Sequence, residues 1–121
     1  MKSYKWWPGE LAVYCDMCIL YAKTIINGKK VGVFPFIVEL RDRETRKIYD
    51  GIELGDIGPK IGYQSKDNGY LKFNHFKIPE ENLLSKFFKI KKNTIKVQGN
   101  PKIIYAGMMK VRINLLGYSA H

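Results

Sequence analysis

The residues of this sequence that could bind a metal or carry redox chemistry are two cysteines, Cys15 and Cys18, which form a Cys-x-x-Cys pair. A structural zinc site needs four ligands, and neither histidine of the chain, His75 or His121, is spaced like part of a second ligand pair. A redox pair would place its first cysteine at a helix N-terminus, whereas the apolar residues after Cys18 predict a strand. We therefore expect two reduced thiols, no metal site and no redox centre.

A second chemically notable stretch is Lys5–Gly9, with the sequence Lys-Trp-Trp-Pro-Gly. Neighbouring residues of a strand face opposite ways, so one of Trp6 and Trp7 could fill the core while the other covers a flat ligand. Core filling alone is the simpler interpretation, and these residues by themselves favour it.

Signals for other kinds of catalysis are weak. The glycines between residues 55 and 62 resemble a phosphate-binding loop only loosely, because no helix N-terminus clearly follows them. Close carboxylate pairs occur in two segments that are predicted to be exposed, Asp42 with Glu44 and Glu80 with Glu81. His75 has no evident partner for general-base catalysis, so we expect a structural role for it and no catalytic residue in the chain.

The charge of the chain is strongly and unevenly basic. Over 121 residues the net charge is +10, and no acidic residue follows Glu81. This surplus indicates either an anionic partner, such as nucleic acid or the phosphates of a nucleotide-like ligand, or simply a solvated face. Hydrophobic residues make up 45% of the chain, which is enough for a folded core.

Membrane and targeting signals are not evident in the sequence. No apolar run approaches the roughly 20 residues that a membrane-spanning helix needs. The N-terminal residues lack the apolar core of a signal peptide. The C-terminal Ser-Ala-His differs from the Ser-Lys-Leu peroxisomal signal.

The elements that must position these residues are mostly strands. Alternating apolar residues and turn residues predict strands at 3–7, 17–26, 31–40, 52–54, 70–78, 87–90 and 95–97, followed by a helix after residue 101. Asn27-Gly28 predicts a hairpin turn, and Asp67-Asn68-Gly69 predicts a second turn. The expected fold is therefore mostly β, a six- to seven-stranded β-barrel or sandwich that ends in a C-terminal helix.

Two features of this pattern need a structural explanation. In the strand at 70–78, Leu71 and Phe73 share one face while Phe76 and Ile78 share the other, which predicts a bulge near His75. The helix has one apolar stripe, formed by Ile104, Met108, Val111 and Leu115. This stripe could dock on the sheet or begin a further helical domain.

Several stretches of the chain resemble the acyl-CoA oxidases, which are relatives of the acyl-CoA dehydrogenases. Lys5–Gly9 resembles the Lys-Trp-Trp-Pro-Gly motif of that family. The middle domain and the start of the helical region of the family resemble, in the same order, Phe36–Arg41, Gly55–Gly62, Asp67–Leu71, Ile78–Leu84 and Tyr105–Arg112. The ordered set is specific, although no single motif is, and it covers nearly the whole chain.

The resemblance implies an FAD-dependent oxidoreductase of peroxisomal fatty-acid β-oxidation. Such an enzyme converts a fatty acyl-CoA to a trans-2-enoyl-CoA and reduces O2 to H2O2. Residues 1–100 would be a middle β-domain without its first strand, and 101–121 the start of a C-terminal helical domain. The full-length parent would be a homodimer with further helical domains. Its catalytic glutamate would lie beyond the matched residues, which predicts that the chain is inactive alone.

For the cofactor, the resemblance implies two contact residues in this sequence. Gly9 matches a glycine whose backbone lies close to the flavin, and Trp7 matches a tryptophan that lines the flavin ring. The family commonly continues with Gly-Gly-Leu-Gly-Lys, whereas Glu10–Val13 follow here, so that a carboxylate comes next to the flavin position. A different class of function stays open on the charge pattern, namely a free-standing basic β-module that binds nucleic acid or another polyanion.

Overall fold

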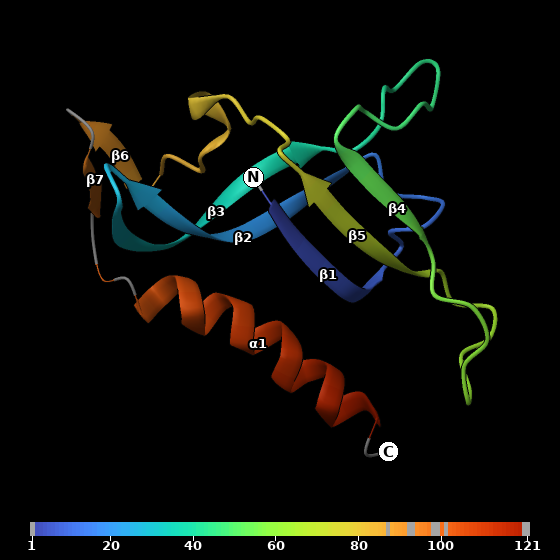
Figure 1. The fold of residues 1–121 in the computed structure, drawn as a ribbon. Coiled ribbons are helices and arrows are strands. Elements are labelled where there is room, and N and C mark those ends of the chain that lie inside the picture. The colour runs from blue at the N-terminus through green and yellow to red at the C-terminus, as the bar shows by residue number, and fades with distance from the viewer. Residues whose placement is uncertain (1, 87, 92–93, 98–99, 101, 120–121) are drawn as a thin grey trace. The chain divides into compact units, whose positions relative to one another are not determined.

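The computed structural model of the chain describes residues 2–86, 88–91, 94–97, 100 and 102–119. These residues form two compact units. The first comprises the residues up to Thr24 together with Gly32–Leu84, and the second comprises Ile25–Val31 with the described residues from Ser85 onward. The expected mostly β chain with a C-terminal helix is confirmed (Figure 1).

The main sheet of the first unit has the strand order β1-β5-β4 and is antiparallel (Figure 1). Its strands are β1 (Lys2–Gly9), β4 (Ile52–Asp56) and β5 (Asn68–Asn74). On β5 the side chains of Leu71 and Phe73 are buried, while Lys72 between them is exposed. This alternation buries one face of the sheet and leaves the other face to solvent.

A separate hairpin consists of β2 (Met17–Ile26) and β3 (Lys29–Glu39). Its turn is Asn27-Gly28, with φ angles of 50° and 76°, as the sequence predicts, because two successive positive φ angles suit asparagine and glycine. The core of the first unit combines side chains from this hairpin, from β4 and β5, and from the segment after β1. Its buried members are Leu11, Leu20, Val38, Leu40, Ile52, Leu54, Leu71 and Phe73.

Of the two predicted alternatives, a barrel or a sandwich, a closed barrel is not seen in the part of the chain that the structure describes. There the strands form three separate sheets, and no hydrogen-bonded ladder joins the β2-β3 hairpin to the main sheet. The two are connected instead by packing of apolar side chains. An alternating pattern predicts which face is buried, but a barrel and an open pair of sheets share that pattern, so the pattern cannot predict closure.

The predicted bulge near His75 is wrong, because the strand ends before that residue. β5 begins at Asn68 and ends at Asn74, not at Ile78. The predicted turn at Asp67-Asn68-Gly69 is therefore also wrong, because Asn68 and Gly69 are the first residues of the strand. His75 has a φ of 53°, which turns the backbone out of the strand. Phe76 and Ile78 then pack against the same core as Phe73, with the Phe73 and Phe76 ring centroids 5.8 Å apart.

A short 3-10 helix, η1 (Glu80–Asn82), follows the core strands, as Pro79-Glu80-Glu81 predicts. Its Asn82 side chain donates a hydrogen bond of 2.9 Å to the carbonyl of Ile37 in β3. Two backbone contacts continue this link, a β-bridge between Phe36 and Leu83 and a 3.1 Å hydrogen bond from the Leu84 N–H to the Pro35 carbonyl. These hydrogen bonds therefore hold the segment that follows β5 against β3.

The second unit contains a small antiparallel hairpin and one long helix. The hairpin consists of β6 (Phe88–Lys91) and β7 (Thr94–Val97), which agrees with the two predicted strands, while the predicted start at Phe87 lies outside the described residues. The helix is α1 (Lys102–Ser119). The Asn100 side chain accepts a 2.9 Å hydrogen bond from the Lys102 N–H, a contact typical of a helix N-terminus.

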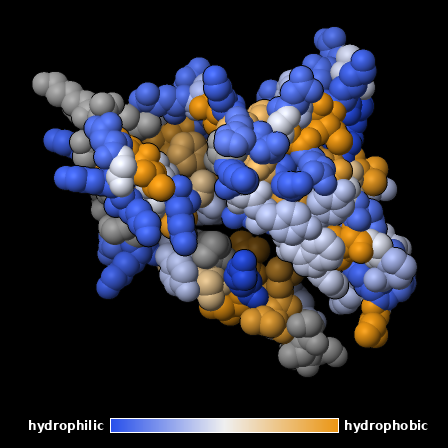
Figure 2. Space-filling view, viewed as in Figure 1, coloured by the Kyte–Doolittle hydropathy of each residue, from blue (hydrophilic) through white to orange (hydrophobic). Residues whose placement is uncertain are grey.

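The apolar residues of α1 are largely exposed, and much of the helix surface is coloured as hydrophobic in Figure 2. Val111 and Leu115, two members of the predicted stripe, are 61% and 64% exposed. The side chains of the other two members, Ile104 and Met108, lie outside what the structure describes. Within the described residues, no helix has the length and apolar composition that crossing a membrane requires.

Candidate functional site

The two predicted cofactor-contact residues, Trp7 and Gly9, lie at the C-terminal end of β1. The pairing of β1 with β5 is regular from Lys2 to Trp6 and then shifts before Gly9, which pairs with Asn68. At this irregularity Trp7 has a φ of 75°, an unusual angle for a bulky residue. Bulges of this kind redirect side chains next to functional sites, so the backbone presents Trp7 differently from a residue in a regular strand.

The prediction that one of the tryptophans fills the core is wrong. Trp6 and Trp7 are each 54% exposed, and neither belongs to the buried core. The expectation that they face opposite ways assumed regular strand geometry, which the positive φ of Trp7 interrupts. Both indole rings are therefore accessible to another molecule.

The Trp6 ring belongs to an exposed aromatic row on the solvent face of the main sheet. The rings of Tyr4, Trp6 and Tyr70 are nearly parallel, with centroids 6.2 to 6.4 Å apart and planes within 16° to 18° of one another. On the neighbouring strand, a Cβ at Gly55 would lie only 2.9 Å from the Tyr70 ring. Glycine at this position therefore lets the tyrosine ring lie across β4.

Gly9 leaves an open space beside the tryptophans. Its φ is not in the left-handed region, so the backbone conformation does not require glycine. A Cβ built on it would meet no atom closer than 4.0 Å, where the nearest atoms are Nδ2 of Asn68 and Cε of Lys66. Neither the backbone nor the packing of the chain therefore explains the absent side chain, which leaves room for another molecule to approach.

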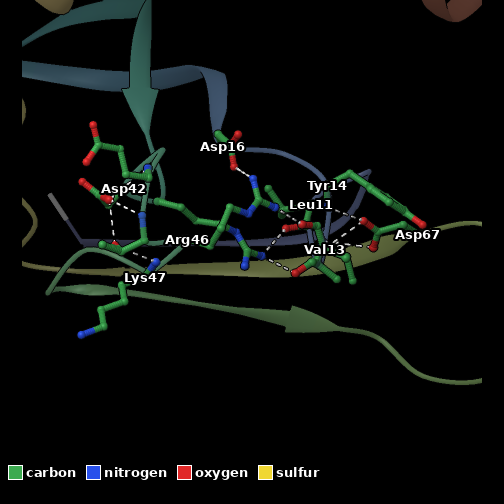
Figure 3. Close-up of polar contacts among 12 residues, drawn as sticks. Leu11, Val13, Tyr14, Asp16, Asp42, Arg46, Lys47 and Asp67 are labelled. Atoms are coloured by element: carbon green, nitrogen blue, oxygen red, sulfur yellow. Dashed lines mark hydrogen bonds and ion pairs between the residues drawn. The ribbon is translucent and has the colours of Figure 1, made fainter.

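The loop after Gly9 is held by the carboxylate of Asp67, which lies immediately before β5. This carboxylate accepts hydrogen bonds from the N–H groups of Ala12 at 3.1 Å, Val13 at 2.9 Å and Tyr14 at 3.3 Å (Figure 3). The Asp67 carbonyl also accepts a 2.7 Å hydrogen bond from the Glu10 N–H. One buried residue thus satisfies four backbone donors of a loop that has no regular structure.

Two arginines hold the carbonyl groups of the same loop. Arg46 donates to the Val13 carbonyl at 2.7 Å and forms an ion pair with Asp16 (Figure 3). Arg41 donates to the carbonyls of Ala12 and, at 3.5 Å, Leu11. Because donors and acceptors of the loop are both engaged by side chains from elsewhere in the chain, the loop has one defined conformation beside Trp7 and Gly9.

Close packing also fixes the loop against the main sheet at Gly69. A Cβ there would lie 2.8 Å from both the Ala12 nitrogen and the Gly55 oxygen, which are backbone atoms. No side chain fits in that space, so glycine is required at position 69 by the approach of the loop.

Glu10 occupies the position where a carboxylate was expected next to the flavin. It has a φ of 61°, and its carboxylate forms an ion pair with the ammonium group of Lys66. The side chains of Glu10 and Lys66 are about half exposed, at 44% and 49%. The carboxylate at the edge of the Gly9 space is thus paired with a cation.

The two cysteines lie beside the core of the first unit. Cys18 lies in β2 and Cys15 precedes it, and both thiols are free and packed against the core. Burial, reinforced by the neighbouring Cys15 and opposed by Lys5, raises the pKa of the Cys18 thiol from 9.0 to about 11. Among the described residues, no group of three or more potential ligands could hold a metal ion.

The sequence did not predict the residues that hold the loop. Asp67 was interpreted as part of a turn, and the sequence indicated no role for the side chains of Arg41 and Arg46. The loop residues that they contact are between 29 and 55 positions away in the sequence, so no local sequence pattern could indicate these contacts. The one available signal was the density of turn-forming residues at Asp67-Asn68-Gly69, which marked the segment as special without indicating what it contacts.

Comparisons with known proteins point to one family. The chain is 43% identical over 121 residues to the peroxisomal acyl-coenzyme A oxidase 1 of Cavia porcellus, which covers 99% of this chain and 18% of that protein. No protein-family model matches the chain. The chain therefore spans about a fifth of the length of the curated relatives that it matches.

Solved structures agree with the sequence comparison. One match is the acyl-CoA oxidase-2 of Caenorhabditis elegans, a structure bound with FAD, ascaroside-CoA and ATP, with 39% identity, a TM-score of 0.83 and coverage of 90% of this chain and 17% of that chain. Another is an acyl-CoA oxidase from tomato, Lycopersicon esculentum, with 35% identity, a TM-score of 0.81 and coverage of 94% and 18%. Sequence and fold thus agree that the chain belongs to the acyl-CoA oxidase family, as a segment that spans about a fifth of its relatives.

Proposed function

We propose that the chain is the FAD- and acyl-CoA-contacting middle domain of an acyl-CoA oxidase. In this proposal residues 1–100 form the β-domain and residues 101–121 begin the helical domain. The full-length parent oxidises a fatty acyl-CoA to a trans-2-enoyl-CoA in β-oxidation and reduces O2 to H2O2. Relatives named as peroxisomal oxidases support the peroxisome as its location, and we propose that it works there as a homodimer.

The observation that carries the proposal is the open space at Gly9 beside two half-exposed tryptophans. A planar cofactor needs a flat apolar surface and a place where the backbone can approach closely, and Trp7 with Gly9 offers both. FAD, when bound, supplies the chemistry that takes two hydrogens from the acyl chain and passes the electrons to oxygen. The residues that would hold its ring are Trp7 and Gly9.

The contribution of the chain itself to the reaction is positioning. Asp67, Arg41 and Arg46 fix the loop after Gly9, so that the edge of the space keeps its shape without a ligand. Preformed sites of this kind lose less conformational entropy on binding than flexible ones. The resemblance implies that the family's catalytic glutamate lies beyond the matched residues, so we propose that the 121 residues alone have no oxidase activity.

The decisive experiment is a chimera in which these 121 residues replace the matched segment of the Cavia porcellus oxidase. We expect the purified chimera to retain FAD, measured as flavin absorbance per protein, and to form H2O2 from a fatty acyl-CoA. Gly9→Val in the chimera should weaken FAD binding by about tenfold or more, because the side chain occupies the approach space. A chimera with native circular dichroism but no FAD would contradict the proposal.

The isolated chain gives a complementary test that also addresses the basic-module alternative. We expect it to form no peroxide from acyl-CoA and added FAD, and turnover by the isolated chain would contradict the proposed inactivity. In a gel-shift assay at low salt we expect no binding of single-stranded nucleic acid. A salt-sensitive shift would favour the alternative, because phosphate contacts by lysines weaken steeply as salt rises.

A further inference from the structure

The ion pair between Glu10 and Lys66 lies directly at the proposed cofactor space. Glu10 is the residue after Gly9, and Cε of Lys66 is 4.0 Å from the position that a Gly9 Cβ would occupy. The ammonium group of Lys66, one bond beyond that carbon, is paired with the Glu10 carboxylate. The edge of the space therefore carries two opposite charges from segments more than 50 residues apart in the sequence.

The backbones of both residues are fixed independently of the ion pair. The Glu10 N–H donates to the Asp67 carbonyl at 2.7 Å, and the Glu10 carbonyl accepts from the Cys15 N–H at 2.7 Å. The Lys66 N–H donates to the Tyr63 carbonyl at 3.0 Å. Since exposed ion pairs contribute little to folding stability, this pair is not needed to hold the loop.

The pair does change the electrostatics of the space. A bare carboxylate beside Gly9 would repel a ring that gains negative charge on reduction, and an ammonium group would attract it. The neighbouring Asp67 carboxylate is turned toward three backbone N–H groups, which offset its charge. The polarity of the edge is therefore set by whether Lys66 stays beside Glu10.

We propose that Glu10 and Lys66 form one charge-positioning unit, in which Glu10 holds the ammonium group of Lys66 beside Gly9. By pairing the Glu10 carboxylate, the unit removes a repulsion that would weaken binding of a planar heteroaromatic ring that becomes electron-rich on reduction, and so would weaken binding of reduced flavin more than of oxidised flavin. This inference rests on the proposed function. It makes Lys66 a positioning residue that takes no part in bond making or breaking.

The test is a double-mutant cycle in the chimera, with the dissociation constants of oxidised and reduced FAD measured anaerobically. We expect Lys66→Met to weaken binding of reduced FAD by about tenfold and of oxidised FAD by about threefold or less, since it leaves Glu10 unpaired. Adding Glu10→Gln to Lys66→Met should restore most of the affinity, because the repelling carboxylate is removed. Lys66→Arg keeps the charge and should behave like the unmodified chimera.

Lys72→Met provides a matched control. Lys72 forms an ion pair with Glu53 at 2.9 Å within the main sheet, and its side chain is about as exposed as that of Lys66. It lies further from the Gly9 space, because Gly9 pairs with Asn68 and Lys72 is four residues beyond Asn68 on β5. We expect this variant to bind oxidised and reduced FAD as tightly as the unmodified chimera does. We also expect every variant to have the melting temperature of the unmodified chimera.

Two results would overturn the inference while leaving the proposed function intact. One is equal loss of oxidised and reduced FAD affinity in Lys66→Met, and the other is a double variant as weak as Lys66→Met alone. Failure of the unmodified, folded chimera to hold any FAD would contradict the proposed function and the inference with it. Raising the ionic strength should reduce the difference between Lys66→Met and the unmodified chimera, because the pair is exposed and screened by salt.

Discussion

The loop from Glu10 to Asp16 and the helix α1 show opposite relations between regular structure and anchoring. The loop belongs to no helix or strand, yet Leu11 is only 2% exposed, and side chains of Asp67, Arg41 and Arg46 hold its backbone. The helix is a regular element of 18 residues, yet its apolar side chains such as Leu115 are mostly exposed.

The difference indicates which of the two segments has a conformation fixed by contacts with the rest of the chain. A helix satisfies its backbone hydrogen bonds locally, so it forms regardless of what covers its side chains. An irregular loop keeps a single conformation only when other parts of the chain satisfy its donors and acceptors. Convergence of distant side chains on an irregular segment is therefore better evidence for a functional site than regular structure is.

Among the substitutions considered, Asp67→Ala is expected to destabilise the anchored loop most. Three N–H groups lose their acceptor, and we expect the free energy of unfolding to fall by about 3 kcal/mol. The measurement is urea denaturation of the isolated chain, followed by circular dichroism. The control is Asp42→Ala, which removes an exposed acceptor that serves only its own turn, with a 2.7 Å hydrogen bond from the Thr45 N–H. A variant as stable as the parent would show that the Asp67 contacts do not hold the loop.

A somewhat smaller effect is expected from a methyl group at Gly69, compared with the same change at Gly9. Gly69→Ala forces backbone atoms of the loop and of β4 apart and should destabilise the chain by about 2 kcal/mol. The methyl group of Gly9→Ala meets no atom closer than 4.0 Å, and the variant should stay within about 0.5 kcal/mol of the parent. Thermal unfolding of the two variants checks the pair, and equal losses would contradict the assignment of open space to Gly9.

The buried thiol of Cys18 gives a pH-dependent prediction. Its pKa is raised to about 11 in the folded chain from 9.0, so between these values the unfolded thiol ionises while the folded thiol stays protonated. The stability that this group contributes is complete below pH 9 and declines as the pH rises to about 11. We expect the stability of Cys18→Ala to fall less over this window. Alkylation by iodoacetamide at pH 8, mapped by mass spectrometry, should leave Cys18 unmodified in the folded chain.

The smallest effect on stability is expected in the helix. Replacing Val111 or Leu115 by Gln should change the free energy of unfolding by no more than about 0.5 kcal/mol, because both side chains are exposed. The same changes should reduce self-association of the isolated chain, measured by sedimentation velocity, since exposed apolar surface promotes it. A loss of stability comparable to that of Gly69→Ala would show that these side chains are packed.

The sequence predicted the local elements well because their causes are local. Asn27-Gly28 defines its turn through its own φ preferences, and Met17–Ile26 was predicted with its observed bounds. The same reasoning failed at Trp7 and His75, where a positive φ in a non-glycine residue changes the direction of the side chains that follow. A positive φ is uncommon in residues other than glycine, so the alternation of a strand does not predict it.

The candidate site was predicted in part. The resemblance to acyl-CoA oxidases named Trp7 and Gly9, and the geometry at Gly9 fits that expectation. Lys66 and Asp67 were not predicted as parts of this site, because their contacts to the loop bridge more than 50 residues. Local sequence patterns carry no information about which distant segment supplies a hydrogen-bond partner.

The separation between Asp67 and its loop partners has a consequence for the order of folding. The β4-β5 pairing closes between Asp56 and Gly69, whereas the Asp67 contacts join residues 53 to 55 positions apart. Closing a longer loop costs more chain entropy, so the short hairpin is expected to form first and to present Asp67 already in place. The segment after Gly9 would then reach its final conformation late, and a nascent chain would acquire the geometry of its candidate site only after residue 74 has been made.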